Sequence, residues 1–432
     1  MSDLIKKFNS GFRWNAFESI FYKAVLLAHQ TCLFYFASRL VYGFSSLLFA
    51  IMYLAVELIN LGFDHSCAQL SVNYFGSKTN FRSYFMPQVI VQVVILMTLL
   101  IFIITNYQFI NSNLLPATAF LTQSQWGLLG LIIVCESLRK TLRMIAQLLF
   151  LNKPAAILES SLILIYVVLF WLTILIGYQI DIYTIYLPLL AQSLIGIIFL
   201  CYFIIPKLKR ELQAHEIKTG LLKIEIKTIF YTRLQNYLYQ LSELLFSSNF
   251  LIYFLSSMTS LLAIGPIKLA NYLAVFIKAL LERTFGLTSL AVFVKNKHLF
   301  NSQKTLFDAT QRKLNLTLMT SLLIFGICIF STNLINPSSY LALLFFCFTL
   351  INNFLIIYEQ LFLVYNQILI LFLLNLVSIL LSLSFIYLYP QASAASLIAL
   401  FIVLRVITLL IVKTITQHFF KNSHQHAGAG TE

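Results

Sequence analysis

The chain has 432 residues, of which 60% are hydrophobic and only 10% are charged, whereas about a quarter of the residues of a soluble domain carry charge. This composition excludes a water-soluble enzyme and leaves no room for a sizeable soluble domain. The formal net charge of +14 would suit nucleic acid, but basic residues in a membrane protein are first explained by its orientation in the bilayer. We therefore expect no nucleic-acid partner.

Apolar windows predict about twelve membrane spans, because a crossing helix needs roughly 20 apolar residues. The windows are too long for strands and lack their period-two alternation, and a backbone in lipid must satisfy its own hydrogen bonds. We expect an all-α integral membrane protein, with about 12 transmembrane helices in two six-helix bundles. The predicted spans are 14–38, 44–62, 86–105, 117–138, 155–177, 183–205, 229–255, 264–284, 314–332, 340–362, 368–388 and 393–412.

The Lys and Arg residues between the spans predict the orientation. When the loops are assigned alternately to two sides, nearly all of these residues fall on one side and only Arg39 falls on the other. Loops rich in Lys and Arg stay in the cytoplasm, so we expect both termini to be cytoplasmic.

The cytoplasmic loop expected after the fourth span is basic, and two acidic residues lie near it. We expect these acids, Glu136 and Glu159, to form structural ion pairs there. The basic residues of this loop are Arg139, Lys140, Arg143 and Lys153.

A charged segment near the midpoint divides the chain into two similar halves. We predict an N-terminal six-helix half at 1–205, a cytoplasmic linker at 206–228, a C-terminal half at 229–421 and a disordered tail at 422–432. Two halves with an even number of spans share one orientation, which is a known transporter plan. A short repeat supports duplication, since Tyr53–Val56 recurs as Tyr272–Val275.

Polar side chains lie on one side of the first, second, seventh and eighth predicted spans. Ionisable groups in a bilayer are costly and usually face the bundle interior or a watery cavity, so these stripes predict one central pathway. Arg405, deep in the last span, is either a cavity cation or a partner for Glu359. The sequence has no nucleotide-binding loop, HExxH or CxxC motif, and its six cysteines are scattered, so we expect no cofactor, no metal and no enzyme activity.

The region around the first two spans resembles the polysaccharide exporter and flippase families of the multidrug/oligosaccharidyl-lipid/polysaccharide exporter superfamily. Arg39-Leu40, Gly43 and Leu61-Gly62-Phe63 match the family pattern, although its usual Gly-Pro-Glu/Asp turn is missing. The resemblance implies a flippase of the bacterial inner membrane that moves undecaprenyl-diphosphate-linked oligosaccharides by alternating access, for surface polysaccharide or lipopolysaccharide (O-antigen) synthesis.

The same resemblance gives the polar stripes their expected roles. Cationic side chains would bind the diphosphate, neutral polar side chains would bind the sugar hydroxyls, and carboxylates would bind a coupling proton or sodium ion. The lipid tail of the substrate would stay among the membrane lipids. The alternatives are a cation-coupled multidrug or toxin exporter of the same superfamily, and a non-transporting scaffold in glycan synthesis. The candidate cations are Lys23, Arg233, Lys268 and Lys278, the neutral groups are Tyr53, Asn60, Asn236 and Gln240, and the coupling residues are Glu18, Glu57 and Glu243.

Overall fold

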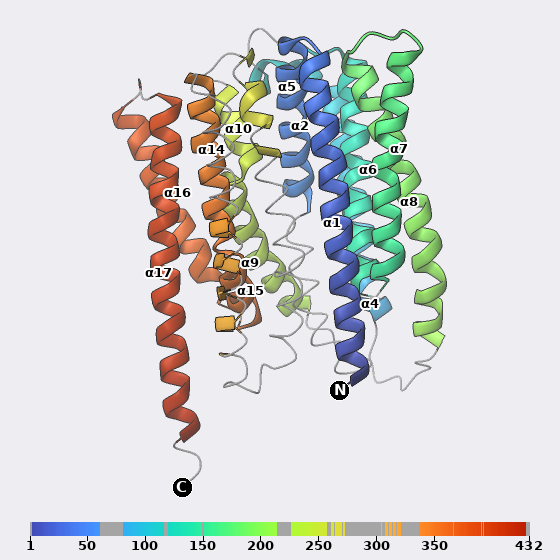
Figure 1. Ribbon diagram of the computed structural model, residues 1–432. Coiled ribbons are helices and arrows are strands. Elements are labelled where there is room, and N and C mark those ends of the chain that lie inside the picture. The colour runs from blue at the N-terminus through green and yellow to red at the C-terminus, as the bar shows by residue number, and fades with distance from the viewer. Residues whose placement is uncertain are drawn as a thin grey trace. The chain divides into compact units, whose positions relative to one another are not determined.

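The computed structural model describes residues 2–60, 81–115, 120–148, 151–213, 226–256, 337–365, 367–389, 391 and 393–428, with parts of 261–272 and 304–320. Every regular element with described bounds is an α-helix (Figure 1). The helices are α1 (Ser2–Phe36), α2 (Arg39–Ile59), α4 (Phe81–Thr105), α5 (Tyr107–Leu114), α6 (Gln123–Leu148), α7 (Asn152–Leu175), α8 (Ile182–Gln213), α9 (Ile226–Leu245), α10 (Ser248–Ser256), α14 (Pro337–Asn353), α15 (Ile356–Val364), α16 (Ile368–Leu388) and α17 (Ala394–Gly428).

The helices form two compact units. The N-terminal unit comprises Met1–Leu244 and Asn249–Gly265, and the C-terminal unit comprises Leu245–Ser248 and Pro266–Glu432. In the N-terminal unit, α1 packs on α7, and α6 packs on α2, α4 and α8. In the C-terminal unit, α17 packs on α14 and α16. The expected fold class, an all-α membrane protein with two helical bundles, is confirmed.

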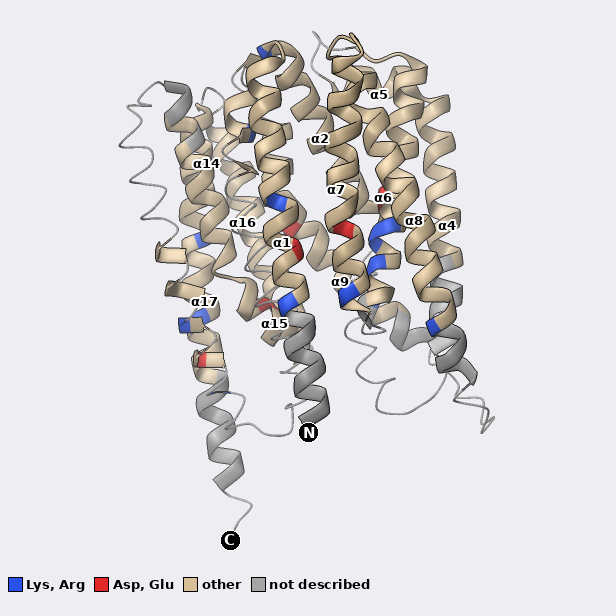
Figure 2. Ribbon diagram, turned by 45° about the vertical axis from the view of Figure 1, so that its right-hand side comes forward, with Lys and Arg blue, Asp and Glu red and all other residues tan. Residues whose placement is uncertain are grey.

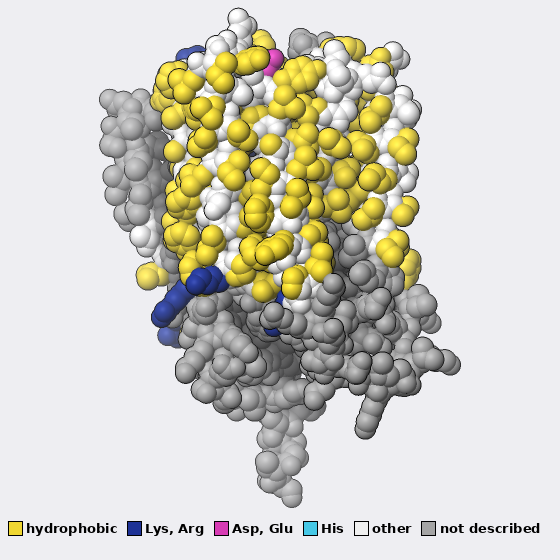
Figure 3. Space-filling model, turned by 90° about the vertical axis from the view of Figure 1, so that its right-hand side faces the viewer, with side chains coloured by type: hydrophobic (Ala, Val, Ile, Leu, Met, Phe, Trp, Pro, Cys, Tyr) yellow, Lys and Arg dark blue, Asp and Glu magenta, His cyan; other side chains and the backbone are white. Residues whose placement is uncertain are grey.

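The surface of the bundle is that of a membrane protein. A broad band of hydrophobic side chains covers the face drawn in Figure 3, and basic side chains gather at its lower edge. Among the described residues, six helices are long and apolar enough to cross a membrane. A seventh span results if the bent pair Ile90–Thr105 and Tyr107–Leu114, with an angle of 84°, counts as one.

Helix α16 shows how such a sequence folds in lipid. Its buried face includes Asn375, Ser378 and Ser382, whereas Leu380 and Leu383 on the other face are more than half exposed. A helix that is polar inside and apolar outside is stable only where lipid replaces water, because the polar groups then find partners in the bundle.

Two predicted spans are not single helices in the structure. The span predicted at 229–255 becomes α9 and α10, with a break at Phe246–Ser247. The span predicted at 340–362 becomes α14 and α15, with a local turn at Phe354–Leu355, and the two together still count as one membrane-capable segment, Leu343–Leu363. Polar Ser and Asn residues lie next to both positions, and such side chains compete with helical backbone hydrogen bonds. The predicted spans 264–284 and 314–332 lie mostly outside the described residues.

Several predicted segment ends differ from the helix ends. Helix α6 continues to Leu148, α8 continues to Gln213 within the predicted linker, and α17 continues through the predicted tail to Gly428. A span predicted from hydropathy ends at the first charged residues, whereas a helix continues as long as its backbone hydrogen bonds are made. This explains why the helices are longer than the predicted spans.

Candidate functional site

A buried ion-pair network lies inside the N-terminal unit. Arg139 on α6 donates to Glu136 on the same helix at 2.7 Å and to Glu159 on α7. Arg143, one turn further along α6, pairs with Glu18 on α1 and lies 3.7 Å from Glu159. The network therefore joins α1, α6 and α7, and Figure 2 shows acidic and basic segments of α6 and α7 at a similar level.

The network is closed to solvent. The side chains of Glu18 and Glu159 are 1% exposed and those of the two arginines 12% and 13%. From α8, the hydroxyl of Ser193 donates to Glu136. Among the residues that the structure describes here, three carboxylates therefore meet two guanidinium groups.

Neutral polar groups lie next to the network in sequence on three of its helices. Ser19 follows Glu18, Ser160 follows Glu159, and Gln192 precedes Ser193. All three are buried, and the hydroxyl groups of Ser19 and Ser160 make no hydrogen bond within the described part of the chain. Neutral polar groups are therefore present beside the ion pairs.

A glycine on α8 makes room for the network. A Cβ atom at Gly196 would lie 2.7 Å from Cδ of Arg139 and 2.9 Å from Leu162. Side chains essentially never approach so closely, so the missing side chain at Gly196 leaves room for the aliphatic part of Arg139.

The network corrects one expectation and confirms another. Arg139 and Arg143 are not in a solvated loop after the fourth span but inside α6, because that helix continues to Leu148. The predicted ion pairing of Glu136 and Glu159 is confirmed. A signal was present in the sequence, since Glu136, Arg139 and Arg143 recur at intervals of three and four residues, which is one helix face.

The predicted coupling residues lie in different surroundings. Glu18 is in the buried network, whereas Glu57 on α2 is 46% exposed and pairs with Lys140 at 2.8 Å. Glu243 lies on α9 and is partly buried.

The predicted substrate cations belong to both units. Lys23 on α1 places Nζ 5.5 Å from the ring of Tyr22, and Nη2 of Arg233 on α9 lies 3.4 Å from Oε1 of Gln92. Lys268, in the C-terminal unit, is 2% exposed. Its Nζ lies 5.3 Å from the ring of Tyr272. Lys278 lies outside the described residues.

The four neutral candidates are all in the N-terminal unit. Tyr53 stacks on Phe49 with ring centroids 6.4 Å apart. Asn60 is the C-cap of α2 and is buried. Asn236 on α9 is buried, and Gln240 on the same helix is partly buried.

A second polar cluster lies in the C-terminal unit. Of its members, the sequence predicted only Arg405. Arg405 on α17 is 1% exposed, donates from Nη1 to Oδ1 of Asn375 at 2.8 Å, and lies 4.0 Å from the ring centroid of Phe246. Asn352 on α14 donates from Nδ2 to the backbone carbonyl of Phe246 at 3.2 Å. The adjacent asparagines at the end of α14, in an otherwise apolar segment, were the available signal.

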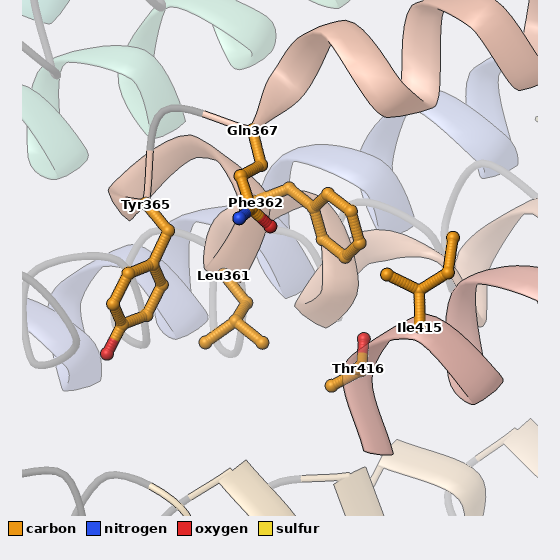
Figure 4. Close-up of a pocket in the computed structure, with 6 residues that line it drawn as sticks. All are labelled: Leu361, Phe362, Tyr365, Gln367, Ile415 and Thr416. Carbon is orange, nitrogen blue, oxygen red and sulfur yellow. The ribbon is translucent and has the colours of Figure 1, made fainter. Parts of the chain in front are cut away.

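A small pocket lies at the turn between α15 and α16. Its six lining residues, shown in Figure 4, leave a cavity of about 10 Å³. A cavity of this size has room for about one water molecule, whereas sites for small molecules usually enclose about 300–1,000 Å³, so this pocket is too small for a typical organic cargo. The lining residues are Leu361, Phe362, Tyr365, Gln367, Ile415 and Thr416.

Comparison with family models and with curated proteins finds no match. Several solved structures share the fold over nearly the whole chain. An outward-facing multidrug resistance MATE family transporter of the MOP superfamily matches with a TM-score of 0.72 and 10% identity, covering 96% of each chain. The eukaryotic MATE transporter AtDTX14 matches with a TM-score of 0.70 and 10% sequence identity, covering 95% of each chain. A mutant of the Vibrio cholerae MATE transporter VcmN matches with a TM-score of 0.68 and 13% sequence identity, covering 98% of each chain. The fold of this chain is therefore that of the MATE transporters.

Proposed function

We propose that the chain is a secondary transporter that uses a proton gradient to export organic molecules by alternating access. The observation that carries the proposal is the buried network of three glutamates and two arginines in an apolar bundle. The MATE fold supports it, because the neighbours are named as transporters and one as a multidrug resistance transporter. The alternative that we kept beside the flippase therefore becomes the main proposal.

The charge balance of the network gives it a role in coupling. Buried ionised groups are costly in a low-dielectric interior unless their charges are balanced, so binding or release of a proton at one of these glutamates changes the stability of the whole network. A proton on one glutamate removes one negative charge from the network. Arg143, which pairs with Glu18 and lies 3.7 Å from Glu159, can then change partner when one of the two is protonated.

Transport of lipid-linked oligosaccharides is the second candidate. It is favoured by two buried cations of the C-terminal unit, Lys268 and Arg405, which are 2% and 1% exposed. A diphosphate cannot cross hydrocarbon without groups that replace its water, and cationic hydrogen-bond donors do this best. We keep the predicted roles of Lys23, Arg233 and Lys278 within this candidate, together with a bacterial inner-membrane location.

Everted membrane vesicles with an imposed pH gradient test the main proposal. Addition of ethidium, a cationic dye, should dissipate the gradient in vesicles that hold the wild-type chain. The rate with the Glu18→Gln variant should be at least tenfold lower, because a glutamine at this position cannot bind or release the coupling proton. Ser161→Ala, on the exposed face of α7 beside Ser160, is the matched control and should keep the wild-type rate.

A second variant protects the test against misfolding. Ser193→Ala keeps all five charges and removes only the hydroxyl bonded to Glu136, so it should fold and shift the pH dependence of transport. Dissipation that is equal in wild type, Glu18→Gln and empty vesicles would contradict the proposal.

The flippase candidate has its own measurement. Deletion of the gene in its source bacterium should leave lipid-linked repeat units on the cytoplasmic leaflet if that candidate is right. Intact surface glycan together with hypersensitivity to the dye would favour the exporter instead.

A further inference from the structure

Two basic side chains lie on the outer faces of α1 and α7, at the end of the bundle where the described part of α1 begins. Arg13 on α1 and Lys153 in the first turn of α7 are both exposed. The two helices pack on each other, and Figure 2 shows basic segments near their lower ends. Neither side chain forms an ion pair within the described part of the chain. Two positive charges are therefore not neutralised at this surface.

The glutamates that follow on the same two helices face the interior instead. Glu18 on α1 and Glu159 on α7 belong to the buried network and are 1% exposed. They lie five residues after Arg13 and six residues after Lys153, which places them on different helix faces from the two cations. The outer surface at this level is therefore positively charged and suited to an anion.

A tryptophan side chain connects the two helices at this point. The Nζ atom of Lys153 lies 5.3 Å from the ring centroid of Trp14, and Arg13 directly precedes Trp14 on α1. The face of an indole ring attracts a cation, so Trp14 holds the ammonium group of Lys153 beside α1. Tryptophan is typical of the membrane interface, because its ring is apolar while its N–H is polar. The two cations are therefore at the level expected for lipid head groups.

The surface next to this cluster is apolar and exposed. The ring of Trp14 packs edge-to-face on Phe17, which is 48% exposed and stacks on Phe21. From Trp14 to Phe21 the helix rises about 10 Å. On α7, Ile157 lies one turn after Lys153 and is 45% exposed. Apolar side chains of both helices thus continue from the cations along the bundle, as a surface for an acyl chain.

We propose that Arg13, Trp14 and Lys153 form a binding site for the head group of an anionic phospholipid, whose acyl chains lie along Phe17 and Ile157. The lipid phosphate accepts charge-assisted hydrogen bonds from the two cations, and the indole N–H is a further donor. The predicted orientation places the site at the cytoplasmic leaflet, where anionic lipids attract basic segments. The site lies on the outer surface of the N-terminal unit and does not depend on the proposed function.

Tryptophan fluorescence tests the site in the purified full-length chain, reconstituted in phosphatidylcholine nanodiscs. The probe is phosphatidylglycerol with bromine on its acyl chains near the head group, because bromine quenches a tryptophan that it contacts. It should quench more strongly than phosphatidylcholine brominated in the same way, and the difference should saturate. Trp14→Phe should remove this difference. The other tryptophans, Trp126, which is 2% exposed, and Trp171, near the opposite end of α7, should respond equally to both lipids.

Charge variants distinguish a defined site from a general attraction of lipid to the basic end of the bundle. Arg13→Gln and Lys153→Gln should each weaken the apparent affinity for phosphatidylglycerol about fivefold. Lys153→Arg should keep the affinity, because it retains the charge and the contact with the ring. Lys207→Gln, on α8 at the same end of the N-terminal unit, removes the same charge and is the matched control, which should behave as wild type.

Three results would overturn the site. The first is equal quenching of the wild type by the two brominated lipids. The second is an equal loss of affinity in Lys207→Gln and Lys153→Gln, which would indicate general attraction. The third is a particle mass that corresponds to two copies of the chain together with loss of the quenching of Trp14, which would show that a second copy covers this face.

The lipid test is independent of the dye assay. Saturable binding of phosphatidylglycerol without dye-driven dissipation of the pH gradient would leave the lipid site standing and reject the proposed function. Dissipation by the wild type without a preference for phosphatidylglycerol would support the proposed function and reject the lipid site.

Discussion

Two neighbouring basic residues on α6 differ in how much their ion pairs contribute to the stability of the fold. Arg143 is buried and pairs with Glu18, whereas Lys140 is 33% exposed and pairs with Glu57. Removal of one partner of a buried pair leaves the other charge desolvated and costs about 3–5 kcal/mol. An exposed pair contributes only about 0–1 kcal/mol.

We therefore expect Arg143→Gln to lower the free energy of unfolding by about 3–5 kcal/mol and Lys140→Gln by at most about 1 kcal/mol. Unfolding in mixed detergent micelles, followed by circular dichroism, gives both values. The double variant Glu18→Gln with Arg143→Gln should recover most of the loss, because two amides can bond to each other. Equal losses for the two single variants would show that Arg143 is hydrated.

At the scale of elements, α8 and α6 approach through Gly196. A Cβ atom there would overlap the side chains of Arg139 and Leu162, so Gly196→Ala forces one of them to move. We expect the variant to lose about 1–3 kcal/mol of stability, the usual cost of overpacking, and to lower the rate of proton-coupled transport. Gly127→Ala is the control, because its Cβ would meet its nearest atom at 4.0 Å and alanine favours a helix.

A closer approach of backbone occurs at Gly43 on α2. A Cβ atom at this position would overlap the backbone carbonyl of Leu261, which cannot rotate away as a side chain can. This contact gives a physical reason for a glycine that the family resemblance had singled out. Gly43→Ala should reduce the folded yield more than Gly196→Ala does, measured by size-exclusion chromatography of the solubilised protein. A yield equal to that of Gly127→Ala would contradict this contact.

At the scale of the whole molecule, the basic residues predict the orientation in the membrane. In the N-terminal unit, α5 lies at one end and the start of α1 and the end of α8 lie at the other (Figure 1). A cysteine at Ser112, exposed on α5, should react with an impermeant maleimide in intact cells. A cysteine at Lys207 on α8 should react only after the cells are opened. Labelling in the reverse order would invert the predicted topology.

The sequence by itself determined the class of the protein. Its low charge and long apolar segments predicted an all-α membrane bundle, and the spacing of Glu136 and Glu159 near basic residues predicted their ion pairs. These properties are local, because transfer of each segment into lipid depends on its own side chains and backbone. For the same reason, hydropathy located most of the described helices but did not detect their breaks or ends.

Only the tertiary structure decided which polar groups meet. Glu18 and Arg143 are 125 residues apart, and Asn352 and Phe246 are 106 residues apart, so no local pattern contains either pair. Their positions are fixed by helix packing, which depends on side chains from several helices at once, such as the missing side chain at Gly196. The predicted cavity stripes indicated that these faces point inward, and packing then paired Glu18 with Arg143 while it left Glu57 with Lys140 at a more exposed site.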